Sequence, residues 1–123
     1  MSARKTILLV DDDEAVLEYL TVKLGSEFDL LSTGSPEEAL ELALGKRPDL
    51  VLCDIDLPGM DGGDISAALF AQAETHAIPL VFLTALVTPA DLAAKGHQLA
   101  GRAAISKQSP ITEIAARIRA SLA

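Results

Sequence analysis

The sequence has few aromatic residues and a single cysteine. Three Phe, one Tyr and no Trp occur among 123 residues, although half of the residues are apolar, so the chain can bury only a modest core. Cys53 is the only cysteine, which excludes a disulfide within the chain, and its position inside an apolar run indicates a buried, inert thiol. The length fits one domain, and we expect residues 1–123 to form that domain without a second one.

Positive charge and long apolar runs are also scarce. Ten Lys and Arg stand against eighteen Asp and Glu, which gives a formal net charge of −8, and a field of that sign repels nucleic-acid phosphates. The apolar run near the N-terminus, residues 7–10, is too short for a signal peptide or a membrane span. We therefore expect no direct binding to nucleic acid, no membrane association and a cytoplasmic location.

Short apolar runs of strand length recur along the chain. Residues 7–10, 50–53 and 80–83 are continuously apolar, which is typical of strands that are covered on both faces in a parallel sheet. The more polar segment 28–32 suits an edge strand. Residues 103–106 are a weaker candidate for a fifth strand and are placed mainly by the alternation of elements.

Proline-containing pairs between these runs indicate helix starts. In Ser35-Pro36, Thr88-Pro89 and Ser109-Pro110, the first residue suits the N-cap and the proline suits the first helical position. Glu38 lies three residues after Ser35 and completes a capping-box pattern, and Gly45 is predicted to end that helix.

Other helix signals complete an alternating pattern. Asp13 and Asp61 are predicted N-caps, and the last helix has one apolar stripe formed by Ile111, Ile114, Ile118 and Leu122. Five strands alternating with five helices predict an α/β fold, a flavodoxin-like doubly wound parallel sheet with strand order 2-1-3-4-5. In such sheets ligands bind beyond the carboxyl ends of the strands.

Polar residues follow the ends of four predicted strands. They are Asp11, Asp12 and Asp13 after the first run, Asp54 and Asp56 after the third, Thr84 after the fourth and Lys107 after the fifth. Several carboxylates at one edge repel one another and demand a cation, and a few hard oxygen ligands in an open site suit Mg²⁺. A metal beside a free carboxylate, a hydroxyl and a lysine is what a phosphoryl group requires, so Asp54 is a candidate nucleophile that forms an aspartyl phosphate.

Each of these residues also has an ordinary structural interpretation. Asp11 and Asp12 fit solvated turns, Asp56 is an ordinary turn residue, and Thr84 and Lys107 mean little singly. Their joint order at successive strand ends favours a functional site.

The motifs resemble the receiver domain of two-component response regulators. They are VDDD at 10–13, CDIDLPGMDG at 53–62, LTA at 83–85 and ISK at 105–107, and the resemblance covers the whole chain. It implies that Asp54 accepts the phosphoryl group, that Asp12 binds Mg²⁺ directly and that Asp11 holds metal-bound water. It also implies that Asp56 offers its backbone carbonyl to the metal.

The same resemblance implies roles for two further residues and for partners. Thr84 resembles the switch hydroxyl, and Lys107 resembles the lysine that pairs with the phosphoryl oxygens. The implied donor is a sensor histidine kinase or a histidine phosphotransfer protein, and the implied target is a downstream protein effector. The chain is then a signalling module with no output domain, and not an enzyme beyond self-phosphorylation and self-dephosphorylation.

Two positions depart from the family pattern. Proline usually follows the lysine directly, whereas Gln108 follows Lys107 here, so this peptide bond is predicted to be trans. An aromatic residue usually stands three positions before the lysine, where this chain has Ala104. Output through a rotating aromatic ring is therefore absent.

Two other functions stay open at this stage. Asp54-x-Asp56 also resembles the motif of haloacid dehalogenase-like phosphatases, in which the first aspartate is the nucleophile and the second a general acid. The missing aromatic allows a receiver-like docking module that is not phosphorylated. A flavin-binding flavodoxin is disfavoured because the first loop is DDDE instead of a phosphate-binding run of Ser, Thr and Gly.

Overall fold

The computed structural model describes residues 4–55, 57, 62–99 and 101–123. Five parallel strands form the sheet: β1 (Thr6–Val10), β2 (Asp29–Thr33), β3 (Leu50–Asp54), β4 (Leu80–Thr84) and β6 (Arg102–Ser106). A two-residue strand, β5 (Gln98–Leu99), pairs antiparallel with β6, so the full order is β2-β1-β3-β4-β6-β5. The predicted fold class and parallel order are confirmed, with β6 as the predicted fifth strand. The extra strand β5 was not predicted, because two residues carry no detectable period.

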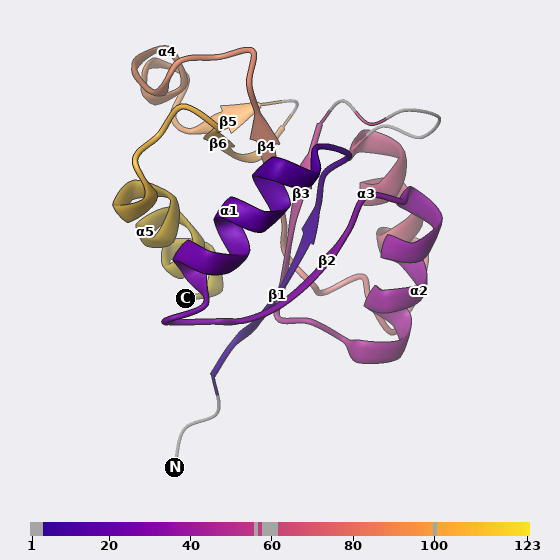
Figure 1. Ribbon diagram of the computed structural model, residues 1–123. Coiled ribbons are helices and arrows are strands. Elements are labelled where there is room, and N and C mark those ends of the chain that lie inside the picture. The colour runs from indigo at the N-terminus through magenta and orange to yellow at the C-terminus, as the bar shows by residue number, and fades with distance from the viewer. Residues whose placement is uncertain (1–3, 56, 58–61, 100) are drawn as a thin grey trace.

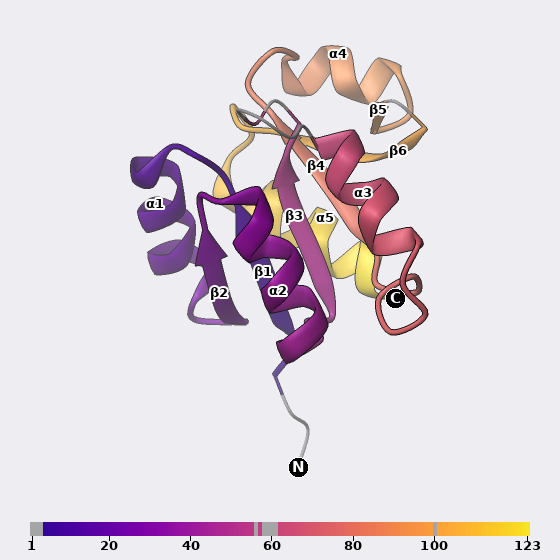
Figure 2. The same cartoon turned by 90° about the vertical axis from the view of Figure 1, so that its right-hand side faces the viewer.

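Helices cover both faces of the sheet. The described residues form α1 (Glu14–Leu24), α2 (Pro36–Lys46), α3 (Gly62–Phe70), α4 (Pro89–Ala94) and α5 (Ile111–Leu122). Figure 1 shows α1 and α5 on one side of the sheet and α2 and α3 on the other, and α4 lies beside β5 and β6 in both views (Figure 2). None of the helices in the described ranges has the length and apolarity that crossing a membrane requires.

The core is divided by the sheet, because successive residues of each strand face opposite sides. Cys53 and Phe82 pack towards α2, α3 and α4, whereas Leu52 and Leu83 pack towards α1 and α5. Cys53 is fully buried, as predicted. Both faces of β3 and β4 are therefore covered, which explains their continuously apolar sequences.

Three helix N-caps are confirmed. The side chains of Asp13, Ser35 and Thr88 accept hydrogen bonds from the backbone N–H groups of Ala15, Glu38 and Asp91, at 3.0, 3.2 and 3.1 Å. The reciprocal part of the capping box differs from the prediction, since Ser35 N–H donates to Thr33 Oγ1 at 3.0 Å. The predicted cap Asp61 lies outside the described residues.

Two predicted helix boundaries are wrong. Gly45 lies within α2, and the helix ends at Lys46. Its C-cap is Arg47, whose φ of 48° is left-handed and whose N–H donates to the Ala43 carbonyl. Pro110 is the N-cap of α5 and not its first residue. Ser109 instead belongs to the preceding turn, because its N–H donates to the Ser106 carbonyl at 3.0 Å.

Candidate functional site

Four strands lead into the same kind of turn at the carboxyl edge of the sheet. In each, a side-chain oxygen accepts a hydrogen bond from the backbone N–H two residues later. The four pairs are Asp11 with Asp13 at 2.9 Å, Thr33 with Ser35 at 3.0 Å, Thr84 with Leu86 at 3.0 Å and Ser106 with Gln108 at 3.1 Å. These short side chains tie each loop to its strand end, so the residues that follow are held at defined positions.

Lys107 connects two carboxylates from different strands. Its Nζ lies 3.0 Å from Asp54 Oδ2 and 2.6 Å from Asp11 Oδ2. Asp54 ends β3, Asp11 directly follows β1, and Lys107 directly follows β6, so the parallel topology brings the three together. The predicted convergence of these residues at one edge of the sheet therefore occurs.

Burial sets the electrostatics of this group. Asp11 and Asp54 are 1% and 8% exposed, and the Lys107 side chain is 18% exposed. Burial raises the pKa of Asp11 above its ordinary value of 3.8, although Lys107 and the Asp13 N–H oppose this. Burial also disfavours the Lys107 cation, but the hydrogen bonds and charges of Asp11 and Asp54 outweigh it and raise the pKa of Lys107 above 10.5. The ammonium is thus charged at neutral pH.

The acidic residues fit a divalent cation. One carboxylate oxygen from each of Asp11, Asp12 and Asp54 lies within 4.8 Å of the other two. Asp11 Oδ2 is buried, and within the described ranges it accepts no hydrogen bond of good geometry, although it contacts the Lys107 ammonium. Asp12 is exposed. An acceptor of this kind beside two more carboxylates matches the hard oxygen ligands of Mg²⁺. Asp56, whose carbonyl was predicted to join them, lies outside the described residues.

Thr84 lies beside the Lys107 loop. It is 1% exposed and pairs in register with Ser106, and its carbonyl accepts a 2.7 Å hydrogen bond from Lys107 N–H. Its hydroxyl accepts the Leu86 N–H, and a hydroxyl that accepts one bond still has a proton to donate. Thr84 is therefore placed at the same edge as Lys107, on the strand between β3 and β6.

The two departures from the family pattern have visible consequences. The described residues contain no cis peptide bond, so the Lys107–Gln108 bond is trans, as predicted. Ala104 is buried and pairs in register with Phe82, the largest fully buried side chain. The aromatic ring on this face of the sheet thus comes from β4, on the strand next to Ala104.

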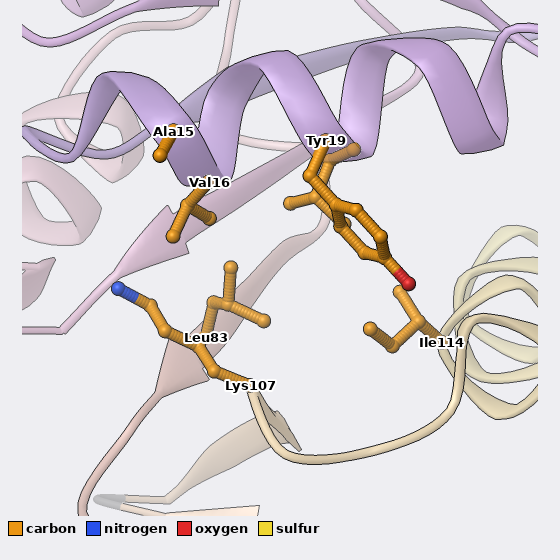
Figure 3. A pocket seen from close by; sticks show the side chains of 7 residues that line it. Ala15, Val16, Tyr19, Leu83, Lys107 and Ile114 are labelled. Carbon is orange, nitrogen blue, oxygen red and sulfur yellow. The ribbon is translucent and has the colours of Figure 1, made fainter.

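An apolar cavity lies next to Lys107, between α1 and α5. Its volume is about 200 Å³, and Figure 3 shows Val16 and Tyr19 of α1 facing Lys107 and Ile114 across it. This cavity is not predictable from the sequence, because it depends on how two helices pack. Ser106 was not predicted either, and the signal for it is a hydroxyl residue at the last strand position.

Comparison with known proteins defines the class to which this fold and site belong. Residues 7–119 match the family model described as the response regulator receiver domain. The chain therefore belongs to the response regulator receiver family, and this match favours the receiver over the phosphatase interpretation.

The chain is similar in sequence to two response regulators of known name. The chain is 39% identical over 120 residues to the DNA-binding response regulator MtrA of Mycobacterium tuberculosis, covering 97% of this chain and 51% of MtrA. It is 42% identical over 87 residues to the response regulator PleD of Caulobacter vibrioides, covering 70% of this chain and 19% of PleD. The chain thus spans about half the length of MtrA and less of PleD.

Solved structures show the same fold. A putative response regulator from Chloroflexus aurantiacus J-10-fl superimposes with a TM-score of 0.82 and 30% identity, covering 98% of each chain. The receiver domain of the sensor histidine kinase PA1611 from Pseudomonas aeruginosa, described with magnesium coordinated in its active site cleft, has a TM-score of 0.80 and 22% identity over 98% of each chain.

Proposed function

We propose that Asp54 accepts a phosphoryl group from a phosphohistidine donor and that this modification switches a protein-interaction surface. The main support for the proposal is the position of the Lys107 ammonium, which lies 3.0 Å from the Asp54 carboxylate and also contacts the buried Asp11 carboxylate. A carboxylate next to a fixed cation can attack phosphorus while the cation neutralises charge on the transferring group.

The transfer is a simple displacement at phosphorus. An oxygen of Asp54 forms a bond to phosphorus, the bond between phosphorus and the donor imidazole nitrogen breaks, and that nitrogen keeps the electron pair. Lys107 stays protonated and pairs with phosphoryl oxygens, and the Thr84 hydroxyl can donate a hydrogen bond to one of them. The product is an aspartyl phosphate that water later hydrolyses.

A divalent cation completes the site in this proposal. Asp11, Asp12 and Asp54 would hold Mg²⁺, with the carbonyl of Asp56 as a further ligand, and the ion would neutralise phosphoryl charge. The closeness of one carboxylate oxygen from each of Asp11, Asp12 and Asp54, all within 4.8 Å of one another, supports this assignment. The magnesium in the PA1611 receiver structure supports it by likeness of fold.

Partners and organisation follow from the same proposal. The donor is a sensor histidine kinase or a histidine phosphotransfer protein, and the recipient of the signal is a downstream protein effector. Residues 1–123 act as one receiver domain, which has no separate substrate to turn over and so is not an enzyme in the usual sense.

Intact-protein mass spectrometry after incubation with acetyl phosphate and Mg²⁺ tests the proposal. We expect one phosphate on the wild type and none on Asp54→Asn. Asp91→Asn, which changes an exposed aspartate at the start of α4, is the matched control and should be phosphorylated like the wild type. A wild type without phosphate would instead support the docking module, and rapid turnover of phosphate esters would support the phosphatase.

A further inference from the structure

Ser106 encloses Lys107 in a short hydrogen-bonded turn. It is the last residue of β6 and is fully buried. Its hydroxyl accepts the N–H of Gln108 at 3.1 Å, and its carbonyl accepts the N–H of Ser109 at 3.0 Å. Two bonds from one residue therefore span the lysine and fix the direction in which the chain leaves the sheet.

The Gln108 N–H is available only because residue 108 is not proline. Proline has no backbone N–H, so a chain with proline after the lysine could not form the bond to the Ser106 hydroxyl. Gln108 is exposed, and its own side chain makes only a long contact, 3.5 Å, to the Ala85 carbonyl. Of these two hydrogen bonds made by Gln108, the one to the Ser106 hydroxyl is thus the shorter.

A lysine side chain needs such a restraint to reach two partners at once. Its stem rotates about several bonds, so the direction of its backbone decides where the ammonium can lie. Lys107 N–H is already bound to the Thr84 carbonyl at 2.7 Å, which fixes the residue on its amino side. The turn made by Ser106 fixes it on its carboxyl side.

We propose that Ser106 is a positioning residue that directs the Lys107 ammonium to Asp54 and Asp11, in place of the proline that this chain lacks. This inference rests on the proposed phosphoryl transfer to Asp54, but the position of Lys107 can be measured without any transfer. Ser106 is fully buried, and it acts through the lysine.

The chain offers its own matched control. Thr33 makes the same hydroxyl turn at the end of β2, at 3.0 Å to Ser35, and is also buried, but Gly34 follows it where Lys107 follows Ser106. Thr33→Val removes a turn hydroxyl that is not next to a lysine, and it leaves the Thr33 carbonyl free to keep its 3.1 Å bond from the Asp11 N–H. Gln108→Ala keeps the N–H and removes only the side-chain contact.

The first measurement is NMR of lysine ammonium and ε-methylene groups in the metal-free protein, with Lys107 assigned by Lys107→Arg. We expect a distinct, slowly exchanging Lys107 signal in the wild type, Thr33→Val, Gln108→Ala and Ser106→Thr. In Ser106→Ala this signal should merge with those of the other lysines. A Lys107 signal in Ser106→Ala equal to that of the wild type would overturn the inference.

The second measurement is the initial rate of phosphorylation by acetyl phosphate at saturating Mg²⁺. Misplacing a charged group should slow Ser106→Ala by roughly tenfold while the Kd for Mg²⁺ changes less than about twofold. Rates within about twofold of wild type are expected for the two controls and for Ser106→Thr. An unchanged rate in Ser106→Ala, or an equal loss in Thr33→Val, would contradict the assignment.

Circular dichroism and a second variant distinguish a folding defect from a loss of the Lys107 position. Ser106→Cys keeps the connectivity of the side chain but replaces the oxygen by a larger and weaker acceptor, so it should lose the Lys107 signal even if Ser106→Ala unfolds. If the wild type takes no phosphate, the proposed function fails, whereas the NMR comparison still decides whether Ser106 positions Lys107.

Discussion

At the scale of single residues, Asp11 and Asp12 are neighbours with opposite environments. Asp11 is buried against Lys107, whereas Asp12 is exposed and close enough to share a cation with Asp11 and Asp54. A buried carboxylate with a raised pKa is costly to ionise, and Lys107 offsets part of this cost. The exposed Asp12 can therefore be removed with little disturbance of the fold, which makes it the better probe of the metal.

We expect Mg²⁺ to raise the unfolding temperature of the wild type. A ligand that binds only the folded protein stabilises it by about 2.7 kcal/mol at 100 times its Kd. Asp12→Ala should lose this response, while Asp91→Asn, which also removes one exposed negative charge, should keep it. Thermal unfolding followed by circular dichroism, with and without MgCl₂, measures both. An equal shift in wild type and Asp12→Ala would refute the metal assignment.

Thr84 is the residue through which we expect the phosphoryl signal to leave the site. Its hydroxyl is bound to the Leu86 N–H, so a movement of the side chain towards a phosphoryl oxygen pulls the following loop with it. Thr84→Ala should still accept phosphate on Asp54 but lose most of the change in segment 84–107.

Hydrogen exchange with and without beryllofluoride, a phosphoryl mimic, reads this change. Thr33→Val is the control, because it removes the same kind of turn at β2. If the wild type shows no change in segment 84–107, or Thr84→Ala shows the same change, then Thr84 is not the transmitter.

At the scale of elements, the caps of α2 and α5 differ in spite of similar sequences. Ser35 caps α2 through its side chain, whereas Pro110 caps α5 without a side-chain hydrogen bond. Ser35→Ala should lower the free energy of unfolding by about 1 kcal/mol, and Ser109→Ala should leave it nearly unchanged. Urea unfolding of both variants measures the difference. Equal losses would mean that Ser109 acts as a cap in solution.

Some elements are predictable from the sequence and others are not, for physical reasons. Strands β1, β3 and β4 were predicted because they are covered on both faces, which requires continuous apolar runs. The end of α2 was not predicted correctly, because Arg47 adopts a left-handed conformation that is more typical of a glycine such as Gly45. The predicted start of α5 was wrong because Ser109 belongs to the turn after Lys107, where its N–H donates to the Ser106 carbonyl.

The site was predictable as far as it depends on topology. Parallel strands bring Asp11, Asp54 and Lys107 to one edge, so their order along the chain was sufficient to place them together. The contact of Lys107 with Asp11 at 2.6 Å was not predictable, because it depends on the path of one loop. In our proposal that path depends on the bond from the Gln108 N–H to the Ser106 hydroxyl. A hydroxyl residue at the end of a strand signals such a turn, but it does not indicate where the lysine side chain then points.

At the scale of the whole molecule, the net charge of −8 governs interactions with polyanions. Although MtrA is a DNA-binding response regulator, this chain matches only 51% of it, and we expect residues 1–123 not to bind DNA. Fluorescence anisotropy of a labelled duplex should show no saturable binding at physiological salt. Binding that weakens as salt rises would contradict this prediction, because it would reveal a cationic surface.

The short strand β5 protects one edge of the sheet from other chains. An edge strand with unpaired backbone groups is a template on which a second molecule can add a strand and begin to aggregate. Here Gln98 and Leu99 pair with Ala103 and Arg102, and the Ala104 N–H donates to the His97 carbonyl. This part of β6 therefore already has a hydrogen-bonded partner within the molecule. Intermolecular strand addition along this part of β6 would first have to displace β5.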